Sequence, residues 1–263
     1  MTVLLKNMSK LLGALVLLVS TVAYAETKSL PALDAKFETV QCATPCKKAV
    51  KRDWWLMRQS EQVELRDIDS KTGQLSTGKL AKRGEIWRHS PDGKTGYLFL
   101  MHEDKRAIEY LFDDLRVLGI NADENQWQVT SQLISDTELA GLKKSSGKPV
   151  SYAGYSAESY TGTIHAGTVN DAKVKLLWLP ELHIPVKIEY TYPKSKVTIQ
   201  LRQLNATGKV LTAKEQAPKT TEELLNSYQQ VYYTDIGDME QNDDAKEWLA
   251  KAQGAPGLHA HHH

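Results

Sequence analysis

The sequence predicts an α+β fold: a curved, mostly antiparallel sheet with a helical insertion and two C-terminal helices. Three observations predict it. Short β-rich segments separated by turn sequences fill most of residues 53–210, helix-type sequence interrupts them at about 113–146, and helical periodicity returns at 218–253. Strands and helices that come in blocks, without a strand–helix–strand rhythm, are typical of the α+β class.

The clearest strands form a predicted hairpin. Apolar and polar side chains alternate in 184–192 and again in 197–202, after the turn Pro193-Lys194-Ser195-Lys196. Alternation with a period of two residues turns one set of side chains toward a core and the other toward water. The expected core side chains are Ile184, Val186, Ile188, Val197, Ile199 and Leu201, and those expected on the opposite face are Lys187, Glu189 and Arg202.

Seven other segments have strand composition and are separated by turn residues such as Ser90-Pro91-Asp92-Gly93. These segments are 54–57, 62–66, 85–88, 97–102, 106–111, 157–165 and 174–179. The last of them is the most continuously apolar, so we expect it to be the most central in the sheet.

The predicted helices have recognisable ends. In the insertion we expect helices at 113–118, closed by Gly119, at 123–133 and at 136–144. Thr220 and Glu223 have the spacing of a capping box before a C-terminal helix. Its predicted apolar face is Leu224, Leu225, Tyr228, Val231 and Tyr232, and that of a second helix is Ala245, Trp248, Leu249 and Ala252.

Residues 1–25 have the three parts of a secretory signal peptide. Lys6 and Lys10 precede an apolar run at 11–19, and Ala23-Tyr24-Ala25 provides small residues for a signal peptidase. The run is shorter than the ~20 residues of a membrane span. We therefore expect cleavage after Ala25 and an exported, soluble, periplasmic protein with no transmembrane segment after cleavage.

Charge excludes one class of partner. The first 25 residues contain two of the 33 basic residues and none of the 32 acidic ones, so the mature chain has a formal charge of −1. A near-neutral chain has no electrostatic attraction for nucleic acid, and we expect no such partner.

The run LLWLPELHIPVK at 176–187, set among many strands and a helical insertion, resembles the periplasmic half-barrel proteins of the LolA/LolB type. The resemblance covers residues 50–205. It implies a curved sheet that wraps over helices, an apolar-ligand cavity and a binding function, and it transfers no individual binding residue. The chain departs from that family in its two cysteines, its C-terminal helices and its His-rich end.

Cys42 and Cys46 are the only cysteines and lie in the N-terminal segment 26–52. In an oxidising compartment they are expected to form a local disulfide. A redox-active pair or a soft-metal site is the alternative, since two thiolates four positions apart can reach one ion. Lys47 stands where a covalent haem motif requires His.

The tail at 254–263 ends in four histidines, His259, His261, His262 and His263. Imidazole nitrogens suit Zn and Cu, so these are candidate metal ligands; a remnant of an expression tag is the alternative.

Enzyme motifs fail at the residues that would complete them. Gly154-Tyr155-Ser156-Ala157-Glu158 lacks the closing Gly of a nucleophile elbow, and His102-Glu103 is not followed by a second zinc-binding His. The sequence therefore favours a non-enzymatic periplasmic binding or chaperone-like protein for an apolar ligand or a lipidated or other periplasmic partner. The alternatives are a Cu- or Zn-handling protein and a thiol-redox accessory protein.

Overall fold

The structure is a computed structural model that describes residues 30–68, 83–165, 171–206, 219–239, 243–252 and 255–256. The predicted signal sequence and the four tail histidines lie outside these residues. No helix in the described ranges is long and apolar enough to cross a membrane.

Thirteen strands form one sheet with the order β13-β6-β5-β4-β3-β2-β1-β12-β11-β10-β9-β7, and β8 pairs with β9 off this path. The strands are β1 (Leu33–Ala43), β2 (Ala49–Arg58), β3 (Gln62–Ile68), β4 (Arg83–His89), β5 (Thr95–Met101), β6 (Arg106–Tyr110), β7 (Lys143–Lys144), β8 (Val150–Tyr152), β9 (Tyr155–Ile164), β10 (Ala172–Leu179), β11 (Ile184–Thr191), β12 (Ser195–Ala206) and β13 (Gln229–Tyr232). Among the strands that the described residues form, only β13 is parallel to its neighbour, β6.

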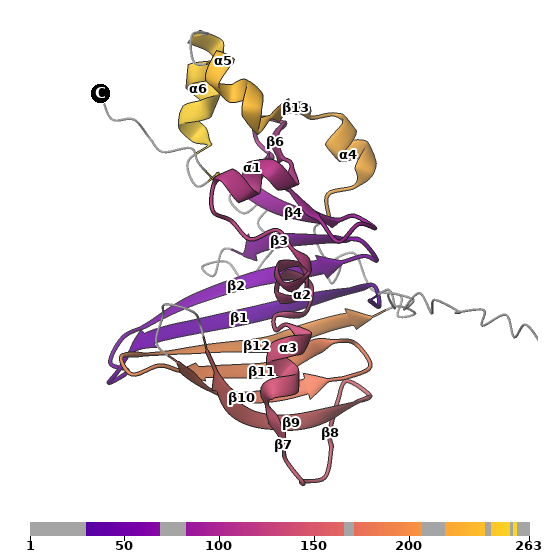
Figure 1. Cartoon of the computed structure of the whole chain (residues 1–263), viewed down its shortest axis with the longest axis vertical. Coiled ribbons are helices and arrows are strands. Elements are labelled where there is room, and N and C mark those ends of the chain that lie inside the picture. Colours follow the sequence, from indigo (N-terminus) through magenta and orange to yellow (C-terminus); the bar gives the residue numbers. More distant parts are fainter. Residues whose placement is uncertain are drawn as a thin grey trace, which may run out of the picture.

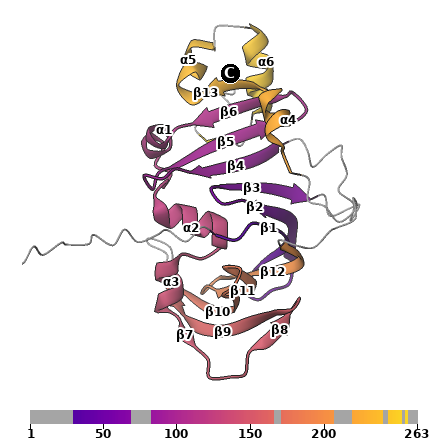
Figure 2. The same cartoon turned by 90° about the vertical axis from the view of Figure 1, so that its right-hand side faces the viewer.

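The sheet is curved and unclosed, as Figures 1 and 2 show. Its register shifts between Lys36 and Phe37 in β1 and between Leu177 and Trp178 in β10. Such bulges bend a strand and increase its twist. The predicted α+β class with a mostly antiparallel sheet is confirmed.

Three helices follow β6 and lie on one face of the sheet, which we call the helical face (Figure 2). They are α1 (Phe112–Val117), α2 (Glu124–Gln132) and α3 (Asp136–Gly141). Asp123 caps α2 by accepting from the Gln126 amide, and Ser135 forms a capping box with Glu138 at α3. The predicted helical insertion is confirmed, although α3 ends earlier than expected because β7 follows it.

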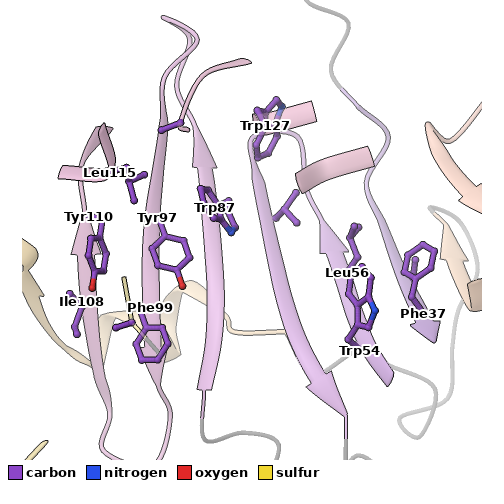
Figure 3. Packing of buried hydrophobic residues seen from close by; sticks show 14 of the residues in the cluster. Phe37, Trp54, Leu56, Trp87, Tyr97, Phe99, Ile108, Tyr110, Leu115 and Trp127 are labelled. Atoms are coloured by element: carbon purple, nitrogen blue, oxygen red, sulfur yellow. The ribbon is translucent and has the colours of Figure 1, made fainter. Parts of the chain in front are cut away.

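Aromatic side chains fill much of the helical face (Figure 3). Phe37 of β1 stacks on Trp54 of β2 with ring centroids 5.1 Å apart. Trp127 of α2 packs on His89 at the end of β4, and Leu115 of α1 is fully buried in the same cluster. The helices therefore cover the sheet by burying apolar side chains against it.

Arg58, the last residue of β2, is fully buried and has no carboxylate partner among the described residues. Its guanidinium instead donates to backbone carbonyls: Pro31 at 3.0 Å, Ser131 at 2.9 Å, His183 at 3.1 Å and Leu182. Burial lowers its pKa to about 10, so the group is charged at neutral pH. One side chain thus joins β2 to the end of α2, to the β10–β11 turn and to the segment before β1.

The predicted 184–202 hairpin is confirmed as β11 and β12. Ile184, Val186, Ile188 and Leu201 are buried on the helical face, whereas Val197 and Ile199 are only half-buried. Lys187 and Glu189 lie on the opposite, outer face, where they form an ion pair.

The C-terminal prediction is wrong in one part. The expected first helix is only α4 (Glu222–Asn226), and β13 follows it, because Val231 and its neighbours pair with β6. Thr221, not Thr220, caps α4. The second helix is confirmed as α6 (Asp243–Lys251), after the 3-10 turn η2 (Tyr233–Asp235) and α5 (Ile236–Met239).

Replacing Arg58 by Met should lower the free energy of unfolding by at least about 3 kcal/mol, because buried carbonyls of three segments lose their donor. Denaturant unfolding measures this loss. The matched control is Arg116→Met on exposed α1, where the pair with Asp113 is worth less than about 1 kcal/mol. Equal effects of the two substitutions would show that Arg58 does not hold the helical layer.

Candidate functional site

The two cysteines form a disulfide between Cys42 and Cys46, as the sequence predicted. It closes the connection from β1 to β2, and the amide of Thr44 donates to the carbonyl of Lys194 at 2.9 Å. Covalently joined sulfur atoms are not thiolates, so in this state the pair can neither bind a metal as thiolate nor act as a nucleophile.

The described histidines contact different polar partners. His89 contacts Glu124 and His183 contacts Gln132, and all four residues line one cleft, whereas His165 contacts Asp171. The described ranges contain no group of three or more His, Cys, Asp or Glu residues that could hold a metal ion. The tail histidines lie outside those ranges, so the metal site there remains a prediction.

A buried polar network lies on the outer face of β3, beneath the segment before α4. Glu64 accepts from the amide of Thr220 at 2.7 Å and from its hydroxyl at 2.8 Å. Arg66 forms an ion pair with Glu64, in which Nε lies 2.8 Å from the carboxylate but does not have the geometry of a hydrogen bond. The Nη2 atom of Arg66 donates to the Thr220 hydroxyl at 2.5 Å and to His102 Nε2 at 2.9 Å. His102 Nδ1 lies 2.7 Å from the Tyr228 hydroxyl.

This network has the residue types of an acid–base site, but its charges and hydrogen bonds hold the structure together. Burial, and secondarily Arg66, lowers the pKa of His102 to about 3. Because Arg66 can only donate, His102 Nε2 is the acceptor and the neutral ring carries its proton on Nδ1. The ring is neutral near pH 7 and its nitrogens are both engaged. The network therefore fixes residues 219–228 to the sheet.

The helical face has one end that its helices leave partly uncovered. The register aligns Tyr190, Val197, Gln41 and Val50 in a row across β11, β12, β1 and β2. The next row begins with Ile188, which is fully buried against α3, and continues with half-buried Ile199. We call Val50, Tyr190, Tyr192, Val197 and Ile199 the open end.

The open end continues the core into solvent. Ile199 packs against the main core cluster, and Tyr190 and Tyr192 pack against the cluster beneath α3. Val50 is 72% exposed. Burial raises the pKa of Tyr190, and Glu138 of α3 adds to the shift, which places this ring beside the helical layer.

The outer face of the same strands is charged. Glu189 pairs with Lys187 and, at 2.9 Å, with Lys196, and these two hydrogen bonds lower the pKa of Glu189 to about 2. Glu38 pairs with Arg202 and lies 4.0 Å from Lys51. Over β11 and β12 the outer face thus carries paired charges and the helical face carries apolar and aromatic side chains. On β2 the helical face is mixed, because Arg52, which pairs with Asp67, follows Val50 on that face.

Two clefts of about 440 and 360 Å³ lie elsewhere. The larger is lined by α2 and neighbouring turns, including His89, Glu124, Gln132 and His183. The smaller follows the β4–β5 turn and the start of α1. The lining of each cleft combines polar and apolar surface in comparable amounts, so neither is the purely apolar cavity that the resemblance implies. Aromatic side chains of the chain itself occupy the middle of the helical face.

Sequence reasoning named no ligand-binding residue, although the signal for the open end was present. The alternation in 184–202 placed Val197 and Ile199 on a core face. What it could not show is that the helices stop short of them, because coverage depends on tertiary contacts such as those of Arg58.

Comparisons with known proteins support the fold alone. No family model and no curated protein matches the chain. Among solved structures, PNGF-II matches with a TM-score of 0.37 and 9% identity, over 80% of this chain and 33% of that one. MucB in the Pseudomonas aeruginosa MucA/MucB complex matches with a TM-score of 0.36 and 14% identity, over 76% and 58%.

A LolA superfamily protein from Nitrosomonas europaea matches with a TM-score of 0.28 and 7% identity, over 70% of this chain and 89% of that one. The expected resemblance to LolA-type proteins is confirmed at the level of the fold. The chain spans about a third of the PNGF-II chain and less than two thirds of the MucB chain.

The His102 network predicts a specific acid sensitivity. Between pH ~6.5 and ~3 the unfolded chain binds a proton at this residue and the folded chain does not, so stability is lost as the pH falls through this window. Relative to His102→Gln, the wild-type free energy of unfolding should fall by up to about 1.4 kcal/mol per pH unit below pH 6.5. Denaturant titrations at several pH values measure the difference.

The control is His165→Gln, at a ring whose side chain is 81% exposed. It should show no comparable slope against wild type. If His102→Gln and wild type ran parallel from pH 7 to pH 4, His102 would not be a buried neutral base of the folded state.

Proposed function

We propose that this chain is a non-enzymatic periplasmic binding or chaperone-like protein that holds an apolar chain, free or attached to a lipidated partner, on the open end of its helical face. The observation that carries the proposal is the open end itself. It is a group of apolar and aromatic side chains, with Gln41 in the same row, that continues the core and that the helical layer leaves half-covered.

The energetics favour an apolar ligand over a polar one at this surface. Half-buried side chains still expose apolar area, and covering that area is worth about 25 cal/mol per Å². The tyrosines add polar hydroxyls at the border, which suits a ligand with an apolar body and a polar head. The charged outer face offers no such surface on the same strands.

The position of the open end also supports binding. Arg58 fixes α2 at one end of β2, and Val50 lies at the other end, eight residues away along the strand. At about 3.3 Å per residue the two lie roughly 26 Å apart. A ligand can therefore approach the sheet without displacing the helical layer.

Periplasmic location rests on the signal-type sequence of residues 1–25, together with the disulfide, which suits an oxidising compartment. Both ring nitrogens of His102 are already engaged, by Arg66 and Tyr228, which supports a binding role over acid–base catalysis.

A charge placed within the open end should weaken binding of an apolar chain. Val197→Glu should lower the affinity for a fluorescent fatty acid such as parinaric acid by at least tenfold, or about 1.4 kcal/mol, because a carboxylate would be desolvated by the ligand. Fluorescence titration of the mature protein measures the affinity.

Thr198→Glu is the matched control, since it adds the same charge one residue along β12 on the outer face. Its affinity should equal that of wild type. Wild type that does not bind the probe, or equal losses in both variants, would contradict the proposal.

A further inference from the structure

Positive charge is concentrated at one tip of the sheet, although the whole chain has a formal charge of only +1. The tip consists of two neighbouring hairpin ends, residues 44–53 and 191–197. They contain six Lys or Arg residues and one acidic residue, Asp53. The chain is therefore nearly neutral as a whole but has a strongly basic surface at this tip.

Part of this charge has no ionic partner nearby. Lys196 pairs with Glu189, Arg52 with Asp67, and Lys51 approaches Glu38. Lys47, Lys48 and Lys194 are exposed, and none of them forms an ion pair with another described residue. Three lysines therefore project from the tip with uncompensated charge.

The two hairpin ends are held together. The Cys42–Cys46 disulfide closes the first, and the Thr44 amide donates to the Lys194 carbonyl of the second. Lysines from both ends thus form one surface, and neither end needs to be ordered by a ligand first.

The basic tip adjoins the open end. Val50 follows Lys47 and Lys48 in the chain and is 72% exposed. Tyr192 immediately precedes the turn that contains Lys194, and its ring stacks on Tyr190 with centroids 6.4 Å apart. The surface thus passes from lysines to tyrosines and an exposed aliphatic residue. The same residue types occur where lipid headgroups give way to acyl chains.

We propose that the hairpin tip docks on an anionic lipid surface, with Lys47, Lys48 and Lys194 facing the headgroup phosphates. Docking brings the open end to the level where acyl chains begin, so this inference rests on the proposed function for the apolar side chains. It assigns a membrane-facing orientation to a protein that passes an apolar chain to or from a bilayer.

The surface fits a lipid better than an acidic protein or nucleic acid. A partner recognised by charge alone would need only the lysines, whereas here the lysines border an apolar row. Lysine heads can remain at the phosphates while their stems and the neighbouring tyrosines contact the apolar zone.

Vesicle co-sedimentation of the mature protein tests the inference. Wild type should bind phosphatidylglycerol vesicles, bind phosphatidylcholine vesicles much more weakly, and release on addition of salt. The triple variant Lys47→Gln, Lys48→Gln, Lys194→Gln should bind phosphatidylglycerol vesicles on the order of a hundredfold more weakly, at about 1 kcal/mol per lysine near the surface. These are exposed side chains, so the variant should fold normally.

The matched control removes three exposed lysines away from the tip: Lys105 after β5, Lys143 in β7 and Lys148 before β8. It should bind vesicles like wild type. Equal losses in both triple variants would overturn the docking site, as would equal binding of wild type to both lipids. Tighter binding to soluble polyglutamate than to phosphatidylglycerol vesicles at matched charge would overturn the lipid in favour of an acidic polymer.

Binding of an uncharged apolar fluorescent probe, N-phenyl-1-naphthylamine, by the tip variant separates this inference from the proposed function. The variant should keep wild-type affinity for the probe, because its open end is unchanged. If wild type binds the probe but not the vesicles, the docking inference fails and the proposed function stands. If wild type binds neither, both fail.

Discussion

The buried guanidinium of Arg58 is the interaction on which the arrangement of this molecule depends. A desolvated charge without a counter-ion costs several kcal/mol unless its donors are satisfied. Here backbone carbonyls from before β1, from the end of α2 and from the β10–β11 turn satisfy them. Segments more than 100 residues apart in sequence meet at one end of β2 because one side chain requires all of them.

This fixed point explains why the helical face is unevenly covered. The helical layer is attached where β2 ends, and the opposite ends of β1, β2, β11 and β12 extend beyond it. An apolar face outside the helical layer remains half-exposed. On the outer face the same strands carry paired charges, which water solvates at little free-energy cost. Water that covers the apolar side chains of the open end is unfavourable, because exposed apolar surface raises the free energy. The chemistry of the open end thus follows from where the helices are attached.

Much of the sheet could be predicted from the sequence, and the exceptions have physical reasons. The alternation in β11 and β12 is strong because one face is buried and the other charged. The sequence did not predict β1 as a strand, although β1 lies between β2 and β12. Its core-facing positions include polar Thr39 and Gln41 at the open end, which interrupt the apolar alternation. β13 was predicted as helix because Leu225, Tyr228 and Val231 have helical spacing, and pairing with β6 overrides that local pattern. Arg58 and Glu64 are charged residues that sequence alone assigns to the surface.

The central claim is that the open end, and not the outer face, contacts an apolar chain. Paramagnetic broadening of methyl NMR signals by a doxyl-labelled fatty acid tests it most directly, because broadening falls steeply with distance from the label. We expect strong broadening at Val50, Val197 and Ile199, and much weaker broadening at Val40, which faces outward between Thr39 and Gln41 on β1. Equal broadening at Val40 and Val197, or broadening confined to residues that line the two clefts, would contradict it.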